Sequence, residues 1–218
     1  AVEIEIDGHA VRIGGMAKGS GMIEPHMATM LAFVTTDAAV GRETLQACVS
    51  HAVACSFNRI TVDGDQSTND TVLMLANGAA GNGGLDERHA QWALFEGAVR
   101  HVTATLAEAI VKDGEGATRL VRVRVCGAGR EADALAAAKT VANSLLCKTA
   151  WFGGDPNWGR IIAAVGRSGV EVDADGWYHI PSRGDSSKAR WPQPTPGAFN
   201  YYHESSQHFI DCIVEKRD

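Results

Sequence analysis

The sequence predicts an α/β protein in which helices pack against layers of a mixed β-sheet. Short runs of alternating or wholly apolar residues, typical of strands, occur in both halves of the chain. Between these runs lie longer segments whose apolar residues recur at the period of an amphipathic helix. Because the two kinds of segment alternate along the chain, we expect the helices to cover the sheet rather than form a separate bundle.

The first element is a predicted β-hairpin. Val2–Ile6 and His9–Ile13 alternate apolar and polar residues, and the Asp7-Gly8 pair between them favours a type I′ turn. A Gly-Gly pair directly afterwards is expected to end the second strand. We interpret this abrupt opening on a hairpin as the continuation of a longer protein.

Three strands and two helices are predicted in the next part of the chain. They are strands at Met30–Thr36, Phe57–Asp63 and Val72–Ala76, and helices at Arg42–Ala54 and 86–111. Asp86 is the expected N-cap of the second helix. Its apolar residues recur every three or four positions, which indicates a face buried against the sheet.

The second half of the chain repeats this alternation. We expect strands at Arg119–Cys126 and Phe209–Val214, and helices at Glu131–Asn143 and from Asp155 onwards. Asp155 is expected near the cap of its helix, with Pro156 in the first turn. Ser144–Leu146 is interpreted as a short apolar connection. After residue 175 the periodicity is lost, and Pro192, Pro194 and Pro196 disfavour a central strand there, so we expect an irregular tail.

The composition argues against two classes of partner. The 218 residues carry a formal net charge of −6 without a basic cluster, which argues against nucleic acid. No apolar run has the length of a membrane span and no signal peptide opens the sequence, so we expect a cytoplasmic protein. The five cysteines are dispersed without metal-ligand spacing, which favours buried thiols, and we assign no metal site.

The segment Lys18–Asp37 joins a loop containing glycine and proline to a predicted strand. Thr29 lies at the junction, directly after Ala28. A threonine at this point is usually a strand residue with a satisfied hydroxyl. It can also be a nucleophile whose own amino group becomes the base once the preceding peptide bond is cut.

Three motifs favour the second interpretation. They are GSGMIEPHMATML at 19–31, VDGDQSTNDT at 62–71 and DPNWGRI at 155–161. Together they closely resemble the ornithine acetyltransferase family, also known as bifunctional glutamate N-acetyltransferases, over about residues 14–173. The resemblance implies the fold of that family, cleavage of a precursor between Ala28 and Thr29, and an acetyl group carried by Thr29.

The chemistry of an N-terminal threonine fits this implication. A free α-amino group has a reference pKa of about 8 and reaches the hydroxyl of its own residue, so cleavage would create nucleophile and base together. Gly19, Gly21 and Pro25 supply the freedom and constraint that a bent, self-cleaving backbone needs. The resemblance further implies N²-acetylornithine as acetyl donor, glutamate as acceptor and no cofactor, with acetyl-CoA as an alternative donor.

By the same resemblance, Lys18 and Glu115 are substrate-binding residues. The Lys18 ammonium could pair with a substrate α-carboxylate, and Glu115, between two glycines, could receive the ornithine ammonium. On spacing alone, Glu115 fits an exposed turn equally well, and Lys18 fits a solvated loop lysine better. The other polar motif residues are interpreted as supporting or packing residues: Asp63, Asp65, Asn69, Asp70, Asp155, Asn157 and Arg160.

The resemblance also implies partners that this sequence does not contain. In the family, an upstream Thr-Gly pair stabilises the oxyanion, and α and β chains assemble as a heterotetramer. Residues 1–28 are therefore expected to end an upstream α chain, 29–175 to form the catalytic β-chain core and 176–218 a divergent tail. Two alternatives stay open: an N-terminal-nucleophile amidohydrolase or aminopeptidase, and an inactive fragment that lacks its upstream chain.

Overall fold

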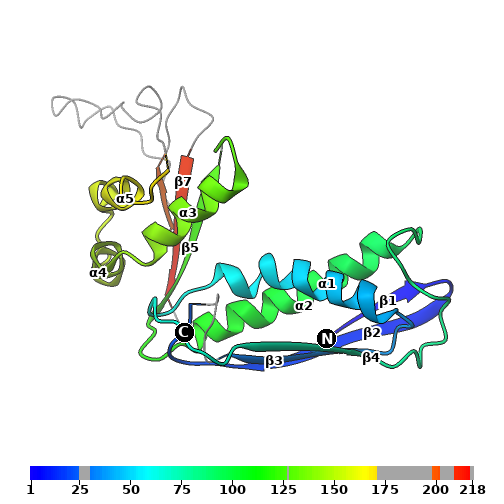
Figure 1. Cartoon of the computed structure of the whole chain (residues 1–218). Coiled ribbons are helices and arrows are strands. Elements are labelled where there is room, and N and C mark those ends of the chain that lie inside the picture. The colour runs from blue at the N-terminus through cyan, green and yellow to red at the C-terminus, as the bar shows by residue number, and fades with distance from the viewer. Residues whose placement is uncertain (25–29, 127, 171–197, 202–208, 217–218) are drawn as a thin grey trace. The chain divides into compact units, whose positions relative to one another are not determined.

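The computed structural model describes residues 1–24, 30–126, 128–170, 198–201 and 209–216. The chain forms two compact units, Ala1–Ala117 and Thr118–Asp218, each with its own sheet and helices (Figure 1). Both units combine strands with packed helices, so the predicted α/β class is confirmed.

The first unit is built on a four-stranded mixed sheet. Its strands are β1 (Val2–Ile6), β2 (His9–Lys18), β3 (Leu31–Thr36) and β4 (Thr71–Ala76), in the order β1-β2-β3-β4. Neighbours pair antiparallel from β1 to β3, whereas β3 and β4 pair parallel. The parallel pair places the start of β3 beside the start of β4, which positions the candidate site described below.

The β1–β2 hairpin turns at Asp7 and Gly8, as predicted, with left-handed φ angles of 51° and 77°. β2 does not end at the Gly-Gly pair, however, but continues to Lys18. A Cβ atom on Gly15 would lie 2.9 Å from both Leu106 Cδ1 and the Phe33 carbonyl oxygen. The predicted strand end is therefore wrong, because this glycine permits a helix to approach the strand closely.

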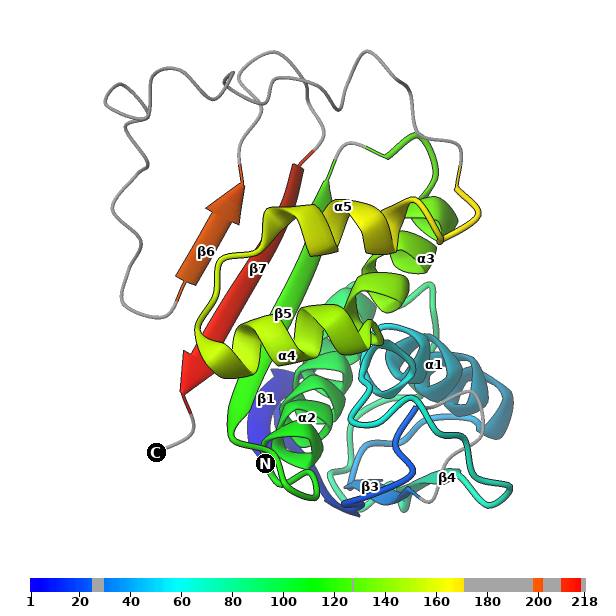
Figure 2. The same cartoon turned by 90° about the vertical axis from the view of Figure 1, so that its left-hand side faces the viewer.

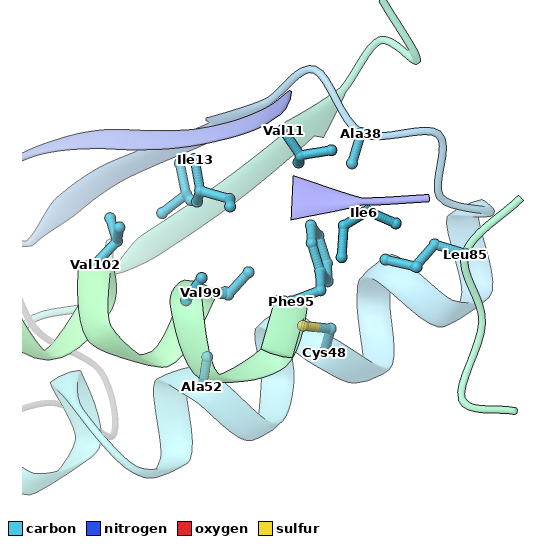
Figure 3. Packing of buried hydrophobic residues seen from close by; sticks show 12 residues of the cluster. Ile6, Val11, Ile13, Ala38, Cys48, Ala52, Leu85, Phe95, Val99 and Val102 are labelled. Carbon is cyan, nitrogen blue, oxygen red and sulfur yellow. The ribbon is translucent and has the colours of Figure 1, made fainter. Parts of the chain in front are cut away.

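Two helices, α1 (Arg42–Ala54) and α2 (Trp92–Lys112), cover one face of this sheet (Figure 1). Figure 3 shows the apolar cluster between the helices and the sheet, to which α2 contributes Phe95, α1 contributes Cys48 and β1 contributes Ile6. The Phe95 and Ile6 side chains are fully buried. This core holds both helices on the strands.

A second buried cluster includes residues from both ends of the connection between β2 and β3. Its buried members are Ile23, Met30, Ala32, Phe57, Ala107 and Ile110. The cluster joins both ends of this connection to α2, because Ala107 and Ile110 lie on that helix.

Two predicted elements of this unit are wrong in place or type. Residues 57–63 form no strand, because Phe57–Arg59 is a 3-10 helix (η1) that buries the Phe57 side chain. α2 begins at Trp92 instead of after Asp86. The Asp86 carboxylate accepts the Arg88 N–H at 2.8 Å and so stabilises a turn before the helix.

The second unit has a three-stranded sheet in the order β5-β7-β6, with neighbouring strands antiparallel (Figure 2). Its strands are β5 (Arg119–Cys126), β6 (Ala198–Tyr201) and β7 (Phe209–Lys216). Its helices are α3 (Glu131–Ala142), α4 (Leu145–Gly153) and α5 (Trp158–Val165). The predicted strand at Phe209–Val214 is confirmed as β7, whereas β6 lies in the part of the tail expected to be irregular. The four prolines after residue 175 lie outside the described residues.

The helices of this unit share one core with β5. Apolar side chains on one face of the strand pack against a buried cluster that includes Val141 of α3, Trp151 of α4 and Ile161 of α5. The sequence prediction misses α4: Ser144 is its N-cap, and the Ser144 Oγ accepts a backbone N–H at 3.4 Å. The cap of α5 is Asn157 instead of the predicted Asp155.

Candidate functional site

Ala28 and Thr29, the predicted cleavage position and nucleophile, lie outside the described residues, as does Pro25. The structure describes the chain up to Glu24 and again from Met30. The candidate site is therefore defined by the residues on these two sides and by the residues that contact them.

Met30, which directly follows Thr29 in the sequence, is fixed at its backbone and at its side chain. Its N–H donates to Asp70 Oδ1 at 2.6 Å, and its carbonyl accepts the Thr71 N–H at 3.0 Å. Its side chain is 2% exposed. Because the acceptor is a carboxylate, the first of these hydrogen bonds is stronger than one between neutral groups.

On the other side of Ala28 and Thr29 in the sequence, the backbone at Met22 and Ile23 is held in a similar way by Asp63. Its Oδ2 accepts the Met22 N–H at 2.7 Å, and its Oδ1 accepts the Ile23 N–H at 3.0 Å. The Ile23 carbonyl in turn accepts the Val62 N–H at 2.7 Å. Met22 has a φ of 51°, which is uncommon for a residue other than glycine. This loop is therefore held in a defined, bent conformation.

Glu115 lies against the same upstream loop. Its N–H donates to the Ser20 carbonyl at 2.8 Å. A Cβ atom on Gly21 would lie 2.8 Å from Glu115 Oε2 and 3.9 Å from Asp63 Oδ2, so two carboxylates flank this glycine. Both acidic residues are exposed and can be reached by a cationic ligand.

Lys18 is the last residue of β2 and is exposed, with Leu31 as its partner in the register of β3. The next residue is Gly19, where a Cβ atom would lie 2.9 Å from Ile23 Cδ1 and 3.8 Å from Met30 Cα. Lys18 thus lies one residue from the point where the two sides of the candidate site approach each other.

A pocket of about 260 Å³ opens beside Asp70 and Met30. Polar side chains in its wall include Gln46 and Ser50 of α1 and Asn58 of η1. Burial raises the pKa of the Asp70 carboxyl above its usual value, although the hydrogen bond from the Met30 N–H lowers it again in part. Sequence reasoning does not find this pocket, because its walls come from segments that are distant in the chain.

The polar residues of the third motif lie in the second unit and connect two helices. Asp155 Oδ2 accepts a hydrogen bond from Asn157 Nδ2 at 3.0 Å. Arg160 Nη1 donates to the Leu146 carbonyl at 2.8 Å and to Thr149 Oγ1 at 3.0 Å, which joins α5 to α4. These contacts agree with the predicted packing role.

The described part of the chain contains free thiols at Cys48, Cys55, Cys126 and Cys147. Within the same residues, no three histidine, cysteine, aspartate or glutamate side chains are grouped as ligands for a metal ion. None of the helices described is both long and apolar enough to cross a membrane.

The sequence profile of the ArgJ family matches residues 1–180. The chain belongs to the ArgJ family. An arginine biosynthesis bifunctional protein ArgJ from Oceanobacillus iheyensis is 55% identical over 174 residues, which cover 80% of this chain and 43% of that protein. A glutamate N-acetyltransferase from Methanocaldococcus jannaschii is 53% identical over 177 residues, with coverage of 80% and 43%. The chain therefore spans less than half the length of these two curated relatives.

Two further members of the ArgJ family extend the comparison. The ArgJ protein of Synechocystis is 46% identical over 212 residues, which cover 94% of this chain and 50% of that protein. That alignment includes part of the tail after residue 175, for which the motifs alone give no counterpart. The crystal structure of the ArgJ protein from Bacillus halodurans is similar with a TM-score of 0.65 and 46% identity, covering 68% of this chain and 70% of that chain. The resemblance inferred from the three motifs is confirmed.

Proposed function

We propose that this chain is the catalytic part of an acetyltransferase of arginine biosynthesis, which moves an acetyl group from N²-acetylornithine to glutamate through an acetyl-Thr29 intermediate. The names of its ArgJ relatives, one of them a glutamate N-acetyltransferase, support this reaction class. The main structural support is that Asp63 and Asp70 hold the backbone on the two sides of the segment that contains Thr29. Acetyl-CoA is the alternative acetyl donor in this proposal.

The proposed nucleophile is formed by self-cleavage. The Thr29 hydroxyl oxygen attacks the Ala28 carbonyl carbon, the C–N bond to Thr29 breaks, and the hydroxyl proton passes to the departing nitrogen. This gives an ester and a free α-amine. Water then hydrolyses the ester and leaves a carboxylate on Ala28. The new α-amino group can serve as base for the hydroxyl beside it.

Acetyl transfer then proceeds in two half-reactions with ping-pong kinetics. The Thr29 α-amine takes the hydroxyl proton as the oxygen attacks the acetyl carbonyl of N²-acetylornithine, the amide C–N bond breaks, and the resulting ammonium gives that proton to the departing ornithine nitrogen. The neutral α-amine of glutamate next attacks the acetyl ester and gives up a proton to the Thr29 amine, which passes it to the departing Thr29 oxygen. The donors that stabilise the oxyanion are assigned to the upstream Thr-Gly pair of the family.

We assign the substrate α-carboxylate to Lys18 and the side-chain ammonium of ornithine to Glu115. The Glu115 carboxylate supports this assignment, because it is exposed and because the missing Cβ of Gly21 leaves room for it beside the loop. The Asp63 carboxylate, which is also close to Gly21, adds a second negative charge, and this favours a cation over a neutral side chain.

We assign residues 1–28 to the end of an upstream α chain, 29–175 to the catalytic core of the β chain and 176–218 to its tail, in a heterotetramer of two α and two β chains. Apolar residues on the sheet face away from α1 and α2 support a packing partner. Met16, Leu73 and Leu75 lie there with exposures of 70%, 46% and 58%. A cluster of exposed apolar side chains on a sheet is typical of an interaction surface.

The proposal is tested by incubating the protein, produced from its complete gene, with N²-acetylornithine in the presence and absence of glutamate. We expect ornithine release limited to one acetylation per site without glutamate, and continuous release together with N-acetylglutamate when glutamate is added. Steady ornithine release that does not depend on glutamate would show a hydrolase instead. Release in neither case would contradict any catalytic role for the processed chain.

A further inference from the structure

The stretch between Ile23 and Met30, which contains the proposed cleavage position, is called the processing segment here. The two carboxylates that bind its two sides, Asp63 and Asp70, belong to one short loop, residues 62–71. We propose that this loop positions the segment for self-cleavage through Asp63 and Asp70. The inference rests on the proposed function, because it assumes cleavage before Thr29. Both residues are positioning residues, since they act through backbone N–H groups and not on the reacting atoms.

The loop binds each side of the segment through one residue that donates its backbone N–H and one aspartate that accepts. On the upstream side, the Val62 N–H donates to the Ile23 carbonyl while Asp63 accepts the N–H groups of Met22 and Ile23. On the downstream side, the Thr71 N–H donates to the Met30 carbonyl, and the Asp70 carboxylate accepts the Met30 N–H. In each pair the two loop residues are adjacent, so the ends of one loop fix both ends of the segment.

Apolar packing makes both attachments more rigid. The Ile23 side chain is fully buried and the Met30 side chain is 2% exposed, and both belong to one cluster. A hydroxyl that attacks the carbonyl of the preceding residue requires a bent backbone, which a free peptide adopts rarely. Fixing both ends in advance removes much of the conformational entropy that the attack would otherwise lose.

Asp70 is the more informative of the two positions, because its partner is the amide that joins Met30 to Thr29. The hydrogen bond of 2.6 Å restrains the peptide on the carboxyl side of the proposed nucleophile. Replacement by alanine removes the acceptor. Replacement by asparagine keeps one acceptor oxygen for the Met30 N–H, removes the charge and replaces the second oxygen by an NH2 donor.

The test measures the rate at which the Thr29 amino terminus forms in the precursor, produced from its complete gene and followed by intact mass. We expect Asp70→Ala to slow cleavage about ten-fold or more, as for the loss of one charge-assisted hydrogen bond. Asp70→Asn should cleave within about three-fold of the wild-type rate, because the acceptor is retained. Asp65→Ala is the matched control in the same loop, since the Asp65 side chain is exposed and its contact with Asp63 is made by its backbone N–H, which alanine keeps.

The thermal unfolding midpoint, measured for each substitution in a Thr29→Ala background that cannot cleave, separates positioning from folding. A folded Asp70→Ala protein with slow cleavage and rescue by asparagine supports the proposal. Cleavage of Asp70→Ala at the wild-type rate overturns it, as does slowing in both Asp70 variants in proportion to lost stability. If the wild-type precursor never splits before Thr29, the proposed function fails, which is a different result from normal cleavage in every variant.

Discussion

Short acidic side chains that accept hydrogen bonds from backbone N–H groups organise the candidate site at the scale of single residues. Asp63 accepts three backbone N–H groups, from Met22, Ile23 and Asp65. Such a carboxylate determines the path of a loop at a point where regular hydrogen bonding is absent. Gly21 complements it, because the lack of a side chain leaves space for the Glu115 carboxylate.

Gly21→Ala tests the role of Glu115 without changing that residue. The new Cβ would lie 2.8 Å from Glu115 Oε2, so the exposed carboxylate must rotate away while the fold is kept. We expect kcat/KM for N²-acetylornithine to fall about ten-fold, which corresponds to one lost charge-assisted contact of about 1.5 kcal/mol. Gly84→Ala, where a Cβ would meet nothing within 4 Å, is the control. Unchanged kinetics in both variants would argue against Glu115 as a substrate-binding residue.

Cys48 gives a residue-scale test of the core. Burial, with a smaller contribution from the Glu96 charge, raises the pKa of its thiol to about 11. The neutral thiol is favoured in the folded state, so its stabilising effect holds below the ordinary cysteine pKa and is lost as the pH rises through about 11. At pH 8 we expect iodoacetamide to modify the half-buried Cys55 much faster than Cys48, as measured by peptide mass spectrometry. Equal rates would contradict this packing of α1.

At the scale of elements, the contact between β2 and α2 depends on a glycine. Gly15→Ala should lower the free energy of unfolding by about 1–3 kcal/mol, because the new Cβ would overlap a backbone oxygen as well as a leucine methyl. Gly14→Ala is the matched control, since its Cβ would lie 3.5 Å from the Ala1 Cβ, an ordinary contact. Urea unfolding of the two variants measures the difference. Equal midpoints would contradict the close approach of helix and strand.

Periodicity in the sequence predicts most elements of this fold but not the loops that form the site. The hairpin, α1 and β5 follow directly from apolar spacing and the Asp-Gly turn. α4 is missed because Leu145 and Leu146 at its start are 75% and 57% exposed, which gives no amphipathic pattern. The 57–63 strand is wrong because the Phe57 side chain is buried by a single 3-10 turn.

The candidate site depends even more than the fold on contacts between residues that are distant in the sequence. Motif matching predicts Lys18, Thr29 and Glu115 as site residues but gives none of the contacts around them. The contacts of Asp63 with Met22 and of Asp70 with Met30 join residues 41 and 40 positions apart. No local pattern encodes a pairing at that separation, so the contacts on which the proposed positioning role of the 62–71 loop rests are found only in three dimensions.

At the scale of the whole molecule, the chain is two units with separate cores, and it spans less than half of the two relatives compared first. The candidate site lies in the first unit, where the motif loops meet α2. We expect substitutions in the core of the second unit, such as Val141→Ala, to lower hydrogen-exchange protection in α3–α5 and leave the amides of β1–β4 unchanged. Loss of protection in both units together would show that they unfold as one.

The proposed reaction requires Thr29 as an N-terminal nucleophile, and mass spectrometry of the intact protein can detect both its formation and its acetylation. After brief incubation with N²-acetylornithine and no glutamate, we predict a chain that begins at Thr29 and carries one acetyl group on that residue, which glutamate then removes. Thr29→Ala should stay uncleaved and unacetylated. A wild-type protein that stays intact across Ala28–Thr29, or an acetyl group that maps to another residue, would contradict the account.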